Sequence, residues 1–206
     1  MSSARPDDRA PCLCLASASP RRRALLEQIG VPHCVRAAHI IETRAPGETP
    51  QEYVLRLARE KALAAVAAGE MLPVLAADTA VVLDDTVYGK PRDRGQALAM
   101  LAALAGRTHH VLTGVALAHG GQVRTALSSS AVHFRELTAA ECEAYWASGE
   151  PCDKAGGYAV QGRAAVFIER LHGSYSGVMG LPLFETAQLL AAAGLIPWLH
   201  ASGAAR

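Results

Sequence analysis

The stretch PVLAADTAVVLDD, residues 73–85, constrains the fold of this chain most. It alternates poorly between apolar and polar residues and is rich in β-branched side chains, which predicts a long strand covered on both faces of its sheet. Asp84 and Asp85 mark a turn into a short strand over 86–89. A single carboxylate, Asp78, interrupts the apolar run.

Strand and helix signals alternate along the rest of the chain. Capping boxes, prolines at helix starts and glycines after helix ends mark the boundaries. Helices are predicted over 20–29, 49–69, 93–106, 138–149 and 181–194. Further strands are predicted over 12–17, 31–38, 108–118, 122–134 and 164–170, with His119-Gly120-Gly121 as a hairpin turn.

This interleaving predicts an α/β protein with a mixed β-sheet flanked by helices. No break in composition divides the chain, so residues 12–194 are predicted to form one domain. A second lobe would have to be built from interior residues, about 93–150. Residues 1–11 and 195–206 are predicted to be loose tails.

Composition excludes several classes of function. The chain has 206 residues, of which 50% are hydrophobic, and a net charge of +1. Bulk nucleic acid and an anionic membrane surface are therefore not expected partners, and any bound anion should be small. Gly and Pro interrupt the most apolar run, 189–199, so no membrane span is predicted.

The five cysteines are scattered without a CxxC or a Cys/His ligand spacing. The sequence therefore indicates neither a disulfide framework nor a zinc site. Reduced thiols, and an N-terminus that is polar and lacks an apolar signal core, predict a cytoplasmic location.

Three arginines, Arg21, Arg22 and Arg23, follow Ser19 and Pro20 at the predicted start of the first helix. Cations are unfavourable there, because a helix N-terminus carries unpaired N–H groups and a partial positive charge. A bound phosphate would make the arginines favourable at this helix N-terminus. The preceding strand places the turn at the sheet edge where α/β proteins bind ligands. A solvated cationic helix face is the alternative.

Asp78 needs a partner, because burying an unpaired charge costs at least several kcal/mol. The partner could be a metal, a cation or a set of hydrogen-bond donors. A structural acid that pairs with a neighbouring arginine or faces solvent is the alternative. Glu42, Lys61 and Lys90 carry no distinctive pattern by themselves, and Lys90 lies in no P-loop motif.

The glycine-rich segment DKAGGYAVQG, 153–162, allows backbone to approach a ligand closely. Gln161 offers a donor and an acceptor in one amide plane, which suits the edge of a cyclic imide. A tight turn held by local hydrogen bonds is the alternative.

Five blocks, taken in order, resemble the signatures of the Maf family. They are LASASPRRRALL (15–26), REKA (59–62), AADTAVVLDDTVYGKPRD (76–93), GEPCDKAGGYAVQG (149–162) and GSYSGVMGLPLFET (173–186). The likeness covers residues 12–194. It implies an α/β fold on an elongated sheet, a cleft between two lobes, and hydrolysis of nucleoside triphosphates to a monophosphate and pyrophosphate.

The resemblance also implies roles for single residues. Asp78 would be the general base, and Glu42 and Asp78 would hold a divalent cation, Mg²⁺ or Mn²⁺. Substrate-binding and specificity roles would fall on Arg21, Thr79, Gln161, Ser17, Ser19, Lys61 and Lys90. A homodimer is implied by the family alone.

The segment 153–162 resembles the branch of the family that acts on dTTP and UTP, whereas the branch that prefers 7-methyl-GTP typically has a Cys-Ala-Gly-Ser-Phe type segment. Gly177 stands where Asn or His is common, and Ala80 where a larger β-branched residue is usual. Two alternatives stay open: a 7-methyl-GTP pyrophosphatase, and a nucleotide-binding regulator of cell division acting as a septum-formation inhibitor.

Overall fold

The computed structural model describes residues 10–196, and within them seven strands form one mixed sheet flanked by six α-helices. The strands are β1 (Leu13–Leu15), β2 (His33–Val35), β3 (Val74–Leu83), β4 (Thr86–Tyr88), β5 (Thr108–His119), β6 (Gln122–Phe134) and β7 (Ile168–His172). The helices are α1 (Pro20–Gln28), α2 (Pro50–Ala67), α3 (Arg94–Leu104), α4 (Ala139–Ala147), α5 (Tyr175–Met179) and α6 (Leu183–Ala192). The predicted α/β class is confirmed.

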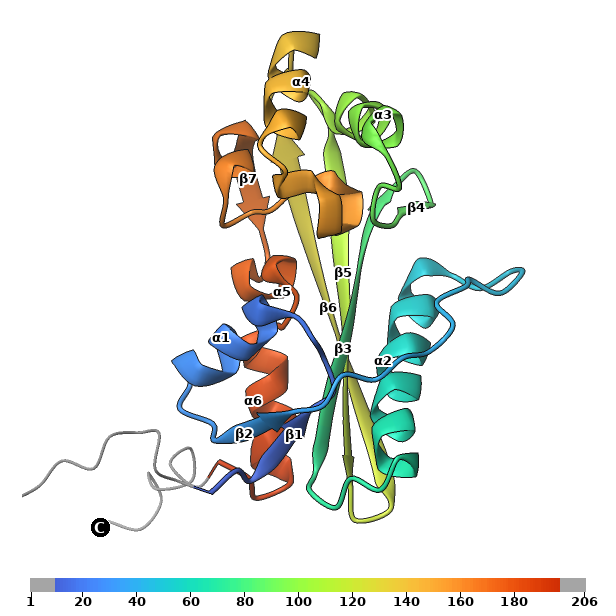
Figure 1. The fold of residues 1–206 in the computed structure, drawn as a ribbon, viewed down its shortest axis with the longest axis vertical. Coiled ribbons are helices and arrows are strands. Elements are labelled where there is room, and N and C mark those ends of the chain that lie inside the picture. Colours follow the sequence, from blue (N-terminus) through green and yellow to red (C-terminus); the bar gives the residue numbers. More distant parts are fainter. Residues whose placement is uncertain (1–9, 197–206) are drawn as a thin grey trace, which may run out of the picture.

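The sheet is elongated because three long antiparallel strands, β3, β5 and β6, run through its centre (Figure 1). Its order is β2-β1-β3-β5-β6-β7, and β4 pairs with β3. The two short N-terminal strands are parallel: β1 pairs with β2 and with β3. Asp84 and Asp85 both have positive φ, as the predicted tight turn between β3 and β4 requires.

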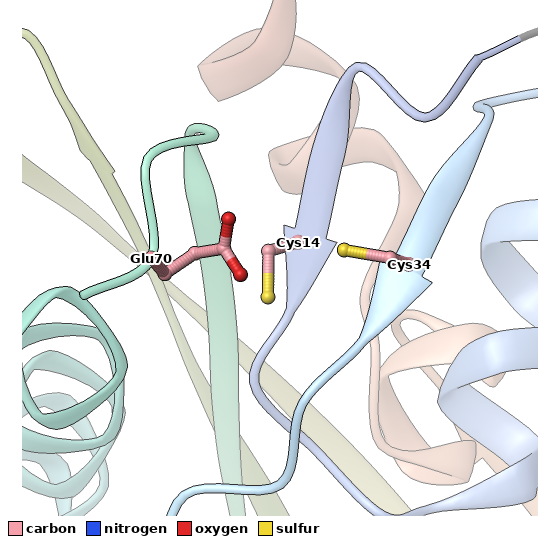
Figure 2. A group of neighbouring side chains, drawn as sticks. All are labelled: Cys14, Cys34 and Glu70. Atoms are coloured by element: carbon pink, nitrogen blue, oxygen red, sulfur yellow. The ribbon is translucent and has the colours of Figure 1, made fainter. Parts of the chain in front are cut away.

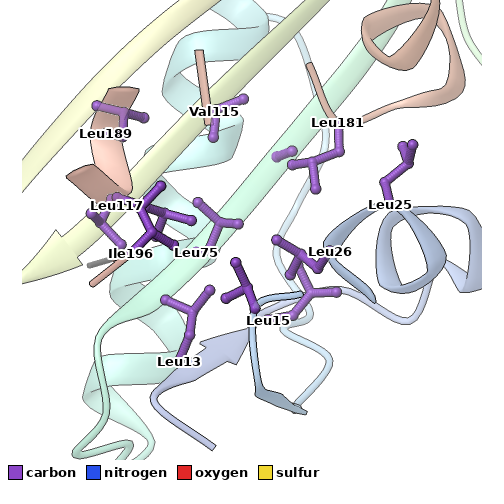
Figure 3. Packing of buried hydrophobic residues seen from close by; sticks show 13 residues of the cluster. Leu13, Leu15, Leu25, Leu26, Leu75, Val115, Leu117, Leu181, Leu189 and Ile196 are labelled. Atoms are coloured by element: carbon purple, nitrogen blue, oxygen red, sulfur yellow. The ribbon is translucent and has the colours of Figure 1, made fainter. Parts of the chain in front are cut away.

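Two layers cover the half of the sheet that contains β1. On one face, leucines of β1, β3 and β5 pack against α1 and α6 (Figure 3). On the other face, small residues of the same strands pack against α2, which lies across the sheet from α1 and α6 (Figure 1). The ten residues of β3 are buried on both faces, apart from half-buried Thr79, as the sequence predicted.

Helix α2 begins at a capping box, in which Thr49 accepts from the Glu52 N–H and Glu52 accepts from the Thr49 N–H. It lies very close to β5 at Gly114. A Cβ at that position would come within 2.5 Å of the Val54 carbonyl oxygen, so only glycine fits there. This contact sets how near α2 can approach the centre of the sheet.

A second hydrophobic cluster occupies the other end of the sheet, where α3 and α4 lie (Figure 1). Its centre is aromatic: Phe134 makes edge contacts with Tyr158 and with Phe167. His109 is fully buried among them and shares a hydrogen bond of 2.8 Å with the Tyr158 hydroxyl. Burial lowers the pKa of His109 to about 4, so it is a neutral core histidine at neutral pH.

Two predicted strands are shorter in the structure, and helix α5 was not predicted. The strand over 31–38 is reduced to the three residues of β2, because β1, its partner among the described strands, is equally short. The strand over 164–170 begins only at Ile168, after a 3₁₀ turn over Arg163–Phe167. The Glu150 carboxylate accepts from the N–H groups of Arg163 and Ala164 and so holds that turn. Helix α5, which Ser174 caps, was not predicted.

Two further features concern the ends of the chain and membranes. The expected tails fall mostly outside the described residues, except that Ile196 is buried against the core beneath α6. Among residues 10–196, no helix combines the length and the apolar character that crossing a membrane requires.

The close contact between α2 and β5 predicts that Gly114→Ala lowers the free energy of unfolding by roughly 1–3 kcal/mol, because the added methyl group overpacks the interface. Gly95→Ala is the matched control, since its Cβ would meet only Asp93 Oδ1 at 3.4 Å within α3. It should be neutral or stabilise the protein by up to about 1 kcal/mol. Urea unfolding measures both, and an unchanged free energy for Gly114→Ala would contradict the packing described.

Candidate active site

A cavity of ≈ 410 Å³ opens beside the N-terminus of α1. Its walls come from the β1–α1 turn, β3, the segment 153–161 and the end of α5. The volume lies within the range of roughly 300–1,000 Å³ that is usual for small-molecule sites. Its lining mixes apolar residues, among them Val81, Val111 and Val178, with polar and charged ones.

The structure brings the predicted site residues together at this cavity. Eight of them line it: Ser17, Ser19, Arg21, Glu42, Lys61, Thr79, Lys90 and Gln161. Asp78 is not part of the lining but is joined to it through Lys61. Residues that lie far apart in the sequence thus converge on one cavity.

Lys61 lies between two carboxylates. Its Nζ atom is 2.6 Å from Asp78 Oδ1 and 2.7 Å from Glu42 Oε1. Lys61 projects from α2, Asp78 from the centre of β3, and Glu42 from the loop after β2. Lys61 and Asp78 are 8% and 7% exposed, so this ion pair is largely removed from water.

The pKa values of the two carboxyl groups are shifted in opposite directions. Burial raises the pKa of Asp78 above its ordinary value, and the charges of Lys61 and Arg22 offset only part of this. Partial burial also acts to raise the pKa of Glu42, but the Lys61 ammonium, helped by Lys90, outweighs it and holds that pKa below the ordinary value. A pair of acids separated in this way can divide the roles of proton acceptor and fixed charge.

Arg22 is the arginine that reaches furthest into the site. Its Nε donates to the Gly180 carbonyl at 2.7 Å. Its two Nη atoms donate to Thr79 Oγ1 at 3.1 Å and to Ser17 Oγ at 3.3 Å. The sequence placed Arg21 and Arg22 at the same helix start, and the family resemblance implied a substrate role for Arg21. Nothing in a run of arginines tells which side chain turns inward.

Arg21 also lines the cavity but faces a different wall. Its Nη1 atom is 3.7 Å from Asp153 Oδ2, so it spans from α1 to the glycine-rich segment. Ser19 is the N-cap residue of α1, yet its side chain makes no capping hydrogen bond. The hydroxyl instead belongs to the cavity lining.

A hydrogen-bonded chain fixes the Arg22 end of the cavity. Thr79 Oγ1 lies 3.0 Å from Thr113 Oγ1, and the Thr113 hydroxyl donates to the Gly177 carbonyl at 2.8 Å. Thr79, predicted as a specificity residue, therefore couples β3 to β5 and α5. Thr113 was not predicted, because its contribution depends on the pairing of β3 with β5. Gly180 was not predicted, because its contribution depends on a contact between the end of α5 and Arg22 of α1.

The glycine-rich segment rests directly on β3. A Cβ on Gly156, which has a φ of +68°, would come within 2.8 Å of Val81 Cγ2. Glu150 holds the following turn, since it also accepts from the Tyr145 hydroxyl at 2.7 Å. The segment is therefore more than a local turn: it forms one wall of the cavity, and Gln161 lies on that wall.

Both departures from the family pattern have a local context. A Cβ on Gly177 would lie 3.1 Å from Ser174 Cβ and 3.2 Å from Ser128 Oγ, so this chain has little room there for a side chain. Ala80 is buried in a cluster with Val54, Val82 and Leu112, on the face of the sheet that α2 covers.

Comparison with known proteins places this site in context. The family model described as Maf-like protein matches residues 12–193. A dTTP/UTP pyrophosphatase of Alkalilimnicola ehrlichii is 57% identical over 186 residues, which cover 87% of this chain and 92% of the relative. Those of Nitrosomonas europaea and Bordetella avium are 50% and 53% identical, covering 89% and 91% of this chain and 95% and 98% of the relatives. The five sequence blocks, the fold and these matches agree, and the chain belongs to the Maf family.

Proposed function

We propose that the protein hydrolyses dTTP and UTP to the nucleoside monophosphate and pyrophosphate. The observation that carries this proposal is the buried Lys61 ammonium held between Asp78 and Glu42 at the edge of a nucleotide-sized cavity. The relatives named dTTP/UTP pyrophosphatase, which match most of the chain, support the choice of substrate. Residues 12–194 would act as one catalytic domain, in which residues 93–150 contribute the second lobe.

Asp78 would accept the proton of the water that attacks the α-phosphorus, either directly or while ligating the cation. Its raised pKa suits this task, because a general base works best when its pKa is close to the working pH. Lys61, Lys90 and Arg21 would offset the negative charge of the triphosphate, since phosphoryl transfer depends chiefly on positioning and electrostatics. Ser17 and Ser19 would donate hydrogen bonds to the same phosphates.

The donor set fits a hard divalent cation. One oxygen of Asp78 and one of Glu42 approach the same ammonium, so the two carboxylates converge, and Mg²⁺ is usually bound by one or two carboxylates together with substrate phosphates. Glu42 and Asp78 would hold Mg²⁺ or Mn²⁺. When bound, the cation would neutralise charge on the phosphate oxygens.

Gln161 would recognise the base of the nucleotide through hydrogen bonds. The O4 and N3–H edge of uracil or thymine presents an acceptor beside a donor, which one oriented amide can match. Cytosine presents the reverse pattern. Arg22 and Thr79 would add specificity, because their hydrogen bond fixes both groups at the cavity wall.

The setting of the reaction is also part of the proposal. All five cysteines are free, which suits a reducing cytoplasm. A homodimer is proposed on the family resemblance alone, and neither bulk nucleic acid nor a membrane is proposed as a partner.

The first test is Asp78→Asn, which should lower the rate of pyrophosphate release from dTTP and UTP by roughly 10²- to 10⁴-fold while nucleotide affinity changes little. Asp85→Asn, in the exposed β3–β4 turn, is the matched control and should keep full activity. Full turnover by Asp78→Asn would remove the proposed role. Absence of pyrophosphate release by the wild-type protein over a broad nucleotide panel would favour a regulatory protein instead.

The same variant has a predicted effect on stability. Because the pKa of Asp78 is raised in the folded state, the native protein binds this proton more tightly than the unfolded chain, and that stabilisation is lost as the pH rises through the folded-state pKa. At neutral pH, Asp78→Asn should therefore unfold with at least the free energy of the wild type. The advantage should disappear below about pH 4, the ordinary range for a free carboxylate. Urea unfolding of both proteins across pH measures this difference. A lower free energy of unfolding for Asp78→Asn than for the wild type at neutral pH would contradict the prediction.

A further test concerns the base. Gln161→Ala should narrow the preference for UTP over CTP by roughly 3- to 10-fold, the worth of about one hydrogen bond. Gln122→Ala, in the exposed hairpin between β5 and β6, is the matched control. Values of kcat/KM for dTTP, UTP, CTP and 7-methyl-GTP measure the effect. An unchanged preference for UTP over CTP in Gln161→Ala would refute the assignment of Gln161. A preference of the wild-type protein for 7-methyl-GTP would assign it to the 7-methyl-GTP branch of the family.

A further inference from the structure

Two thiols and a carboxylate meet on the sheet away from the cavity (Figure 2). Cys14 lies on β1 and Cys34 is its direct register partner on the parallel strand β2. Glu70 follows α2, in the connection to β3, and its carboxylate points toward Cys14. The Sγ atoms and a carboxylate oxygen all lie within 4.8 Å of one another, and none of the three residues lines the cavity.

We propose that Cys14, Cys34 and Glu70 form a second metal site, which binds a thiophilic divalent cation such as Zn²⁺. Thiolates and a carboxylate are established zinc ligands. Two sulfurs on one tetrahedral zinc are about 3.8 Å apart, given a Zn–S bond of about 2.3 Å. The donors are therefore within about 1 Å of a binding arrangement, a gap that side-chain rotation can close.

The surroundings of Glu70 support this assignment. Its Oε1 atom accepts from the N–H groups of Met71 and Leu72, each at 3.0 Å. Arg36 Nε lies 3.4 Å from its Oε2 atom. Outer contacts of this kind orient ligating carboxylates.

The charges of the three ligands also favour a divalent cation at this site. Two thiolates and a carboxylate carry three negative charges, which Zn²⁺ and the Arg36 guanidinium would together neutralise. Without a metal, burial and the neighbouring Cys34 and Glu70 raise the pKa of the Cys14 thiol to about 12, so a bound cation would have to displace its proton. Cys14 is fully buried, but Cys34 and Glu70 are partly exposed and leave a route of entry.

Binding would join three segments that lead into the candidate active site. β1 continues to Ser17, the chain after β2 reaches Glu42, and the connection holding Glu70 follows the helix of Lys61. The sequence alone does not reveal this group of ligands, because the three residues are far apart in the chain and match no metal-ligand spacing.

Titration of the reduced full-length protein with Co²⁺ tests the site. We expect thiolate-to-cobalt charge-transfer absorption that saturates at one equivalent, is bleached by Zn²⁺ and is unaffected by excess Mg²⁺. Cys34→Ser should weaken Co²⁺ binding by at least the roughly 10- to 100-fold that loss of an outer-shell partner costs, and Glu70→Gln should also weaken it. These two partly exposed positions are chosen because buried Cys14→Ser could misfold.

Two control variants separate this site from the other thiols and from the active site. Cys152→Ser removes an exposed cysteine and should leave the cobalt absorption unchanged. Asp78→Asn should also leave it unchanged. Absence of thiolate absorption in the wild type, or absorption that survives Cys34→Ser at full affinity, would overturn the proposal. Loss of the signal in Cys152→Ser or Asp78→Asn would overturn it equally.

Discussion

The contact of Lys61 with both Asp78 and Glu42 is the interaction on which the rest of this site depends. Asp78 is buried in the middle of β3, where an unpaired charge would be very costly, and Lys61 is the cation that makes its position tolerable. Lys61 can reach it only because α2 packs closely on the sheet, with Gly114 clearing space beneath Val54. The position of the buried Asp78 carboxylate and the packing of α2 therefore depend on each other.

The long central strands explain why the cavity lies where it does. One hydrophobic cluster packs around β1, α1 and α6, and another packs around α3, α4 and the aromatic residues near Phe134. β3 and β5 contribute to both clusters. The cavity takes lining residues from the stretch of β3 where the clusters meet: Thr79 lies between them, and Val81 belongs to the second cluster. The sheet thus presents Asp78 and Thr79, while the start of α1 and the glycine-rich segment bring Arg21 and Gln161 to the cavity.

Local signals in the sequence predicted most elements, because capping boxes, turn residues and hydrophobic runs act over a few neighbouring residues. Thr49 and Thr138 cap their helices as predicted, and Asp84 with Asp85 makes its turn. Signals that depend on distant contacts were missed. The hydrogen bonding of Arg22 depends on Gly180, and the turn at 163–167 depends on Glu150. The family resemblance, rather than spacing, singled out Lys61 and Glu42.

The most direct test is a crystal structure with a nonhydrolysable α,β-methylene analogue of UTP and Mg²⁺. We expect the triphosphate to lie in the cavity, with the α-phosphate contacting Lys61 and separated from Asp78 by one water, and the uracil edge facing Gln161. A triphosphate bound elsewhere, with Lys61 still held between Asp78 and Glu42 and touching no phosphate, would contradict it.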